Sequence, residues 1–294
     1  MHSSDSLVDA TDGRVLEVTT QGDPSGRTVL FHHGSPGSSS LISFFDDVTY
    51  EVNLFFVSIS RPGYGASTRL EGRSIAAVVE DARTVLDHLG RDEYVAAGWS
   101  GGGPHALACA ALDRPRCRAA WSLAGVVPID VDFDWTAGMG PENVEEFALS
   151  LQGGPEYEAM MVQSAREFST ATPENIISLF GGLVSDVDKR ALQNDAARAA
   201  LAYSCRHAFA NGWHGFYDDD RAFFSPWGFD PTAITAPVGV WYGDEDLMVP
   251  SSHGKWLGDH LPTASVTHLA AEGHVSLIIN HVDELARGFD RAFE

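Results

Sequence analysis

The chain has 294 residues, of which 44% are hydrophobic and 20% are charged, so it is long enough to bury a large core. Its 41 acidic and 19 basic residues give a formal net charge of -22, a surface that repels phosphate backbones and anionic lipid. Neither nucleic acid nor a membrane is therefore an expected partner. No apolar run approaches the roughly 18 residues of a membrane-spanning helix, and the polar N-terminus lacks the pattern of a secretory signal. We therefore expect a cytoplasmic protein.

The first half of the chain alternates between expected strands and expected helices. Apolar or alternating runs predict strands at residues 14–20, 28–32, 54–59, 94–98 and 118–123. Helical patterns lie between them, at residues 41–48, 74–89 and 102–112, the second with Ser74 as its expected N-cap. Such alternation, with nearly continuous apolar strands, is typical of a parallel sheet covered by helices on both faces. The predicted fold class is therefore α/β.

The alternation stops in the middle of the chain. From residue 130 to residue 224 only helical patterns occur, at residues 142–150, 157–168, 173–181 and 188–210. Strands return at residues 237–242 and 265–269, with helices expected at residues 252–260 and 275–293. The sequence thus predicts a core formed by residues 1–129 and 225–294, interrupted by an all-helical cap at residues 130–224.

The stretch Gly98-Trp99-Ser100-Gly101-Gly102 has the pattern G-x-S-x-G between an expected strand and an expected helix. Glycines on such a turn remove Cβ atoms that would otherwise clash, so the serine hydroxyl can project outward. The amides after Ser100 lie at a helix N-terminus, where a developing negative charge is stabilised. A purely structural glycine turn would carry the same letters, but the position between strand and helix favours Ser100 as a nucleophile.

A serine nucleophile needs a general base, which in turn needs a carboxylate to orient it. His274 follows the last expected strand and opens the last helix, at the same edge of the sheet as Ser100. The strand at residues 237–242 runs into the acidic turn GDEDLMVP. We choose Asp246 from this turn as the acid, with Asp244 as the alternative.

An acyl-transfer site also needs amide donors that hold the oxyanion, and the loop after the strand at residues 28–32 is rich in glycine. It reads HHGSPG, from His32 to Gly37. We expect the amides of Ser35 and Gly101 to form the oxyanion hole. The remaining expected members of this oxyanion loop are His33, which should brace it rather than transfer protons, with Gly34 and Gly37.

In chain order, HHGSPG, GWSGG, GDEDLMVP and EGH resemble the α/β-hydrolase superfamily, specifically its members with a helical cap and an HGxPG-type loop. The resemblance implies that fold, a cap over the site, and a triad of Ser100, Asp246 and His274. It places the acid three residues after the glycine of the acidic turn, with Asp130 as a less common alternative. Because Ser100 is not an aspartate, the resemblance argues against the dehalogenase and epoxide-hydrolase branches.

We therefore expect a serine hydrolase that cleaves a small-molecule carboxylic ester through an acyl-serine intermediate, with no metal and no cofactor. Alternatives are an aminopeptidase similar to the proline iminopeptidases, whose substrate ammonium could meet the acidic residues Glu142, Glu145 and Glu146, and a carbon–carbon bond hydrolase. A ligand receptor on the same fold is the non-enzyme alternative, and a homodimer is left open. The aromatic residues expected to bind substrate are Trp99, Trp135, Phe147, Trp213, Phe216 and Tyr217.

Overall fold

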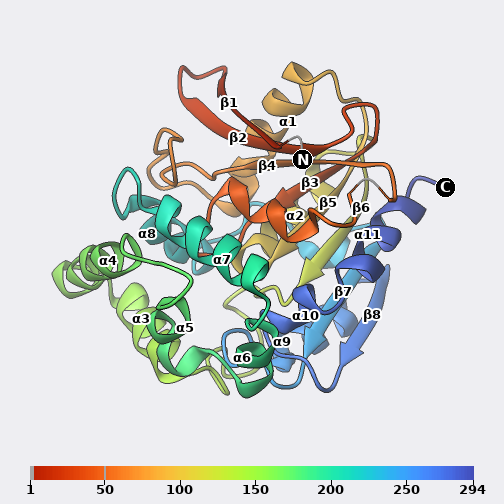
Figure 1. Cartoon of the computed structure of the whole chain (residues 1–294). Helices are drawn as coiled ribbons and strands as arrows, with labels where there is room; N and C mark the ends of the chain where they lie inside the picture. Colours follow the sequence, from red (N-terminus) through yellow and green to blue (C-terminus); the bar gives the residue numbers. More distant parts are fainter. Residues whose placement is uncertain (1–2, 50) are drawn as a thin grey trace.

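The computed structural model describes residues 3–49 and 51–294, and these residues form one central sheet of eight strands (Figure 1). The strands are β1 (Ser3–Asp9), β2 (Val15–Gly22), β3 (Arg27–His32), β4 (Leu54–Ile59), β5 (Tyr94–Trp99), β6 (Cys117–Leu123), β7 (Val238–Gly243) and β8 (Ala264–Leu269). Their order in the sheet is β1-β2-β4-β3-β5-β6-β7-β8. β2 is antiparallel to both of its neighbours, and all other adjacent pairs are parallel. The prediction of a mostly parallel α/β sheet is confirmed.

Helices pack around this sheet and also form a group of their own. The α-helices are α1 (Val78–His88), α2 (Gly103–Leu112), α3 (Pro141–Gln152), α4 (Pro155–Phe168), α5 (Ile176–Leu179), α6 (Asp186–Ala191), α7 (Asp195–Ala208), α8 (His214–Phe223), α9 (Ser251–His260), α10 (Ser276–Ile279) and α11 (Val282–Arg291). Short 3₁₀ helices are η1 (Ser39–Phe45), η2 (Ile75–Ala77), η3 (Ser100–Gly102), η4 (Gly181–Leu183) and η5 (Pro231–Ala233). Helices α3 to α8, called the helical insertion below, all follow β6 and precede β7, and they lie together beside the sheet (Figure 1). The exact boundaries predicted for the cap, residues 130 and 224, remain a prediction.

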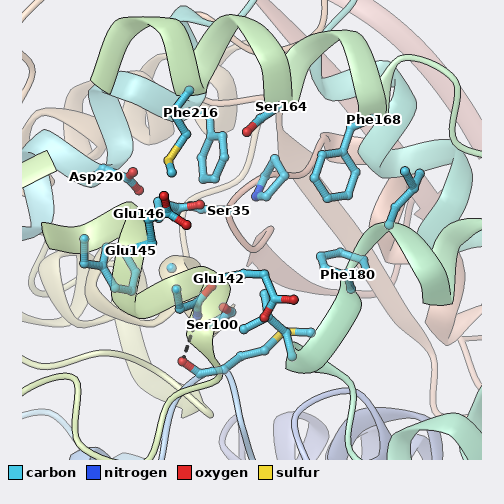
Figure 2. Close-up of a pocket in the computed structure, with 18 of the residues that line it drawn as sticks. Ser35, Ser100, Glu142, Glu145, Glu146, Ser164, Phe168, Phe180, Phe216 and Asp220 are labelled. Carbon is cyan, nitrogen blue, oxygen red and sulfur yellow. Dashed lines mark hydrogen bonds between the residues drawn. The ribbon is translucent and has the colours of Figure 1, made fainter. Parts of the chain in front are cut away.

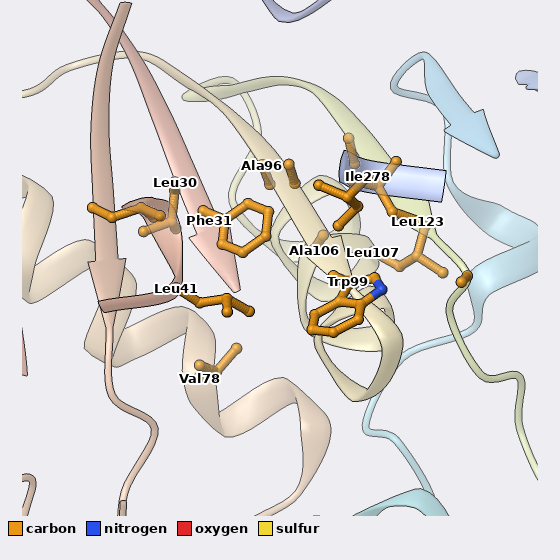
Figure 3. Packing of buried hydrophobic residues seen from close by; sticks show 14 of the residues in the cluster. Leu30, Phe31, Leu41, Val78, Ala96, Trp99, Ala106, Leu107, Leu123 and Ile278 are labelled. Carbon is orange, nitrogen blue, oxygen red and sulfur yellow. The ribbon is translucent and has the colours of Figure 1, made fainter. Parts of the chain in front are cut away.

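The core lies between the central strands and the helices that cover them. β4 and β5 are buried along their whole length, because both of their faces are covered and their residues are almost all apolar. Figure 3 shows part of this buried cluster, to which Leu30 and Phe31 of β3, Leu107 of α2 and Ile278 of α10 all belong. This packing fixes the central strands, and with them the loops at their ends.

Several elements differ from the sequence predictions. β1 forms at the polar N-terminal stretch, where we expected no strand, because its backbone pairs with β2 from Ser3↔Gln21 to Asp9↔Val15. Ser74 precedes the 3₁₀ helix η2 rather than α1, and its side chain makes no capping hydrogen bond. The expected final helix is divided into α10 and α11. Among the described residues, no helix is both long and apolar enough to cross a membrane.

The strand order brings two of the motif loops together. The chain leaves β3 for β4 on one side and then returns to β5 on the other side, so the direction of winding changes between β3 and β5. At such a switch point, the loops after the two strands separate and leave a crevice for ligands. His32 is paired with Gly98, so the loop that begins at His33 lies directly beside Ser100.

Candidate active site

Ser100 stands on a strained turn between β5 and α2. Its φ is +59°, in the left-handed region that non-glycine residues seldom adopt. The turn is so tight that a Cβ placed on Gly98 would lie 2.0 Å from the carbonyl oxygen of Gly102. Glycine at position 98 is therefore a steric requirement for the turn that presents the Ser100 hydroxyl.

The loop after β3 packs against the turn that carries Ser100. A Cβ on Gly101 would lie 2.4 Å from the Ser35 hydroxyl oxygen and 2.7 Å from Cζ of Phe223, so a larger residue here would force one of these side chains to move. A Cβ on Gly34 would come within 3.3 Å of the Cβ of Ser100. The two backbones whose amides we expect to hold an oxyanion, at Ser35 and Gly101, are thus close neighbours.

His274 and Asp246 come from the loops after the adjacent strands β8 and β7. Nδ1 of His274 lies 2.8 Å from Oδ2 of Asp246, and both side chains are almost completely buried. The other carboxylate oxygen of Asp246 accepts hydrogen bonds from the amides of Met248 and Val249, each at 2.8 Å. An ionised carboxylate can only accept, so the His274 proton sits on Nδ1 and Nε2 is free to accept another.

The two alternative acids lie elsewhere. Asp244 contacts Nε2 of His268 at 2.8 Å and is partly exposed, whereas Asp130 is exposed on the loop after β6. Among the described residues, neither acid makes a hydrogen bond with His274, and Ser100 also makes none with it. Bonds between a nucleophile and its base are often long without substrate and tighten in the substrate complex.

His33 and Gly37 shape the loop around Ser35. Nδ1 of His33 lies 2.7 Å from the carbonyl oxygen of Gly34, and its Nε2 accepts a hydrogen bond from the Arg61 amide at 3.1 Å. Burial lowers the pKa of His33 well below its usual value, so the ring is neutral. A Cβ on Gly37 would approach the oxygen of Gly34 to 2.9 Å, which keeps this turn closed to larger residues.

A buried carboxylate from the helical insertion holds the loop that carries His274, and sequence reasoning missed it. Asp188 is fully buried and accepts hydrogen bonds from the backbone amides of His274, Val275 and Ser276, at 3.1, 2.9 and 2.8 Å. The Ser185 hydroxyl donates a further bond to it at 2.9 Å. Asp188 is a positioning residue, since it fixes the backbone of the candidate base. The sequence motif Ser-x-x-Asp at residues 185–188 predicts a helix start here but not this contact.

A second buried carboxylate of the insertion holds the oxyanion loop. Asp219 of α8 accepts hydrogen bonds from the hydroxyls of Ser35 and Tyr64, at 2.5 and 2.8 Å, and pairs with Arg61 and Arg73, each at 2.6 Å. Although burial opposes its ionisation, the two arginines hold the pKa of Asp219 well below its usual value. Two cations face one anion, so this cluster carries excess positive charge beside the oxyanion loop.

A cavity of about 380 Å³ opens beside Ser100 (Figure 2). The core contributes Ser35, Ser100, Gly101 and Met248 to its wall, and the helical insertion contributes most of the rest, from α3, α4, α5 and α8. This volume lies in the range of small-molecule sites. Of the six aromatic residues expected to bind substrate, Phe147 and Phe216 line the cavity.

The other four aromatic residues lie outside the cavity wall. Trp99 packs on His274, with ring centroids 5.0 Å apart, and donates a hydrogen bond from Nε1 to the His274 carbonyl. Trp135 is buried and donates to the Val127 carbonyl, and Trp213 packs against Tyr217. Their apolar surface is used for packing rather than for the wall of this cavity.

Among the described residues, no group of three or more side chains is arranged to hold a metal ion.

Comparison with known proteins defines the class. The sequence model of the family described as alpha/beta hydrolase fold matches residues 27–280, and the chain belongs to that family. A non-heme haloperoxidase from Rhodococcus erythropolis is 26% identical over 251 residues, which cover 83% of each chain.

Solved structures with the same fold include an esterase from Exiguobacterium antarcticum, with a TM-score of 0.68 and 14% identity, covering 99% of this chain and 100% of that one. A bromoperoxidase from Bacillus anthracis has a TM-score of 0.68 and 17% identity over 99% of both chains. At these identities the structural likeness supports the fold alone. The family match and the haloperoxidase relative support a hydrolase-type enzyme.

Proposed function

We propose that the protein is a serine hydrolase that cleaves a small-molecule carboxylic ester. The observation that carries this proposal is the buried contact of His274 with Asp246 at the sheet edge where Ser100 stands on its strained turn. A binding protein has no need of a strained serine beside an oriented imidazole.

In the proposed reaction, Nε2 of His274 takes the Ser100 proton while the serine oxygen attacks the ester carbonyl. Asp246 stabilises the imidazolium that forms, and the amides of Ser35 and Gly101 hold the oxyanion. The tetrahedral intermediate expels the alcohol, which receives the proton from His274, and leaves an acyl-serine. Water then gives a proton to His274 and attacks the acyl group, releasing the acid and restoring Ser100. No metal or cofactor takes part.

The helical insertion is proposed to act as the cap that selects the substrate. Helices α3, α4, α5 and α8 supply most of the cavity wall beside Ser100, so differences in this segment alter the space offered to the acyl or alcohol group. Two buried aspartates of the insertion contact the loops around the reacting groups: Asp188 accepts a hydrogen bond from the His274 amide, and Asp219 accepts one from the Ser35 hydroxyl. The proposed cap therefore also helps to position these loops.

Labelling with a fluorophosphonate probe tests the nucleophile. The wild type should be labelled and Ser100→Ala should not, and equal labelling of both would refute the assignment. Hydrolysis of p-nitrophenyl esters of graded acyl length should accompany labelling. Cleavage of prolyl anilides without cleavage of the esters would favour the aminopeptidase alternative instead.

The relative named as a haloperoxidase motivates one additional assay. If hydrogen peroxide replaces water as the second nucleophile, the acyl-serine is converted to a peracid and free serine. The peracid then oxidises bromide to hypobromous acid and is itself reduced to the carboxylic acid. Bromination that requires both a carboxylic acid or ester and Ser100 would support this second activity of the same site. Bromination that persists in Ser100→Ala would exclude it.

A further inference from the structure

Three successive aspartates on α8, Asp218, Asp219 and Asp220, are all buried, but they differ in the number of arginines that pair with them. Asp218 pairs with Arg69, whose Nε and Nη2 lie 2.8 and 2.9 Å from its oxygens. Asp219 pairs with two arginines, as described above. Asp220 has no basic partner among the residues that the structure describes. Its Oδ2 accepts a hydrogen bond from the Tyr157 hydroxyl at 2.7 Å, and its Oδ1 is buried without any hydrogen-bond partner.

Asp220 faces the cavity beside Ser100. Phe216, Asp220 and Phe223 are spaced by four and three residues on α8, so they share one face of the helix, and all three line the cavity. Phe223 is the residue whose ring lies against Gly101. Asp220 therefore stands about one helical turn, or ~5 Å along the helix, from Phe223, whose ring reaches Gly101.

Glu146 of α3 forms a pair with Asp220. Figure 2 shows both carboxyl groups inside the cavity and directed toward each other, and both residues line it. Burial raises the pKa of Glu146 to about 8, and burial together with Glu146 raises the pKa of Asp220 well above its usual value. The neighbouring arginines pair with Asp218 and Asp219, and no described basic side chain forms an ion pair with Asp220 or Glu146, so a bound cation would supply the missing counter-charge.

The cavity wall indicates which kind of cation fits. Phe168, Phe180, Phe216 and Phe223 surround the space, and aromatic faces attract organic cations. A divalent metal prefers several oxygen ligands, and the described residues provide no cluster of three or more metal-ligating side chains here.

We propose that Asp220 and Glu146 bind a protonated amine carried by the substrate, in the same cavity that Ser100 lines. This inference rests on the proposed function, because it assigns the cation to the substrate of Ser100. The site selects substrates that carry an ammonium group in addition to the scissile ester, and neutral analogues of the same shape bind less well.

Calorimetric binding of two ligands that undergo no hydrolysis tests the cation site alone. Benzylammonium should bind the wild type at least tenfold more tightly than benzyl alcohol, which has the same ring and a neutral end. Asp220→Asn and Glu146→Gln, which keep the side-chain shape, should each reduce this preference at least fivefold. Glu158→Gln is the matched control, because Glu158 is an exposed carboxylate on the insertion outside the cavity, and it should leave the preference unchanged.

Equal affinity for the two ligands in the wild type, or no measurable benzylammonium binding, would overturn the proposal, as would a preference that survives both substitutions. If Asp220→Asn does not fold by circular dichroism, Glu146→Gln decides the question. Hydrolysis of neutral p-nitrophenyl esters is measured separately. Ammonium binding without ester hydrolysis would leave the cation site standing while the proposed hydrolase function fails.

Discussion

Replacing Asp246 by asparagine tests whether Asp246 or Asp244, both in the turn after β7, is the acid that orients His274. In the wild type, Oδ1 of Asp246 accepts two backbone amides at 2.8 Å, and Oδ2 faces Nδ1 of His274 at the same distance. The asparagine oxygen should keep the two backbone bonds, which turns its NH₂ group toward Nδ1. The imidazole must then accept at Nδ1 and carry its proton on Nε2, where it can no longer take the proton of Ser100.

The expected loss follows from this wrong tautomer. An asparagine in the corresponding place of serine-protease triads lowers kcat about 10⁴-fold, which corresponds to about 5.5 kcal/mol of transition-state free energy. Burst and steady-state kinetics with a p-nitrophenyl ester measure kcat, and circular dichroism checks the fold. Asp244→Asn is the control, because Asp244 contacts His268 rather than His274, and it should retain kcat within about threefold. A loss below tenfold in Asp246→Asn, or a collapse in Asp244→Asn, would refute the reasoning.

Three other perturbations follow from the contacts described above. Asp188→Asn replaces one acceptor oxygen by an NH₂ donor that faces buried backbone amides. The free energy of unfolding measured with urea should therefore fall by about 2–4 kcal/mol, and kcat should fall at unchanged KM. An unaltered stability together with an unaltered kcat would contradict its positioning role. Gly101→Ala must displace Ser35 or Phe223, so ester hydrolysis should fall ~10²-fold or more, and normal turnover would argue against an oxyanion hole at this place. The pKa of Glu146 is about 8 in the folded protein and near its ordinary 4.5 in the unfolded chain. Between these two pH values the folded state holds the proton more tightly, so the contribution of Glu146 to stability falls as pH rises. Urea midpoints measured from pH 5 to 8 should therefore decline less in Glu146→Gln than in the wild type, and parallel curves would show that the carboxyl is not perturbed.

The sheet and the motif loops could be predicted because their signals are local. Apolar runs mark the buried strands, and the glycines around Ser100 are required by backbone contacts within a few residues, such as that between Gly98 and Gly102. Once the strands are assigned to a parallel sheet, the loops at their carboxyl ends must share an edge. For this reason the sequence alone predicts that His274 and Asp246 are neighbours.

The structure adds features that depend on distant pairing. β1 is polar and is held by backbone hydrogen bonds to β2, so its side chains carry no strong strand pattern. The helix expected at residues 188–210 is two helices, because the Asn194 side chain accepts a bond from the Ala197 amide and starts α7 afresh. The arginines that pair with Asp219 lie about 150 residues earlier in the chain. No local sequence pattern therefore shows which of the three successive aspartates has no arginine partner.

The anchoring of the helical insertion at two points limits how this enzyme could be engineered. Asp188 accepts hydrogen bonds from the loop of His274, and Asp219 accepts one from the Ser35 hydroxyl. The segment that lines most of the cavity therefore also holds two of the loops around the candidate site. A chimera that received this segment from a relative would inherit a new specificity only if the donor carried matching carboxylates at both anchors. Redesign of substrate range should therefore change the cavity-facing side chains of α3, α4 and α8 while leaving these two aspartates and their arginines in place.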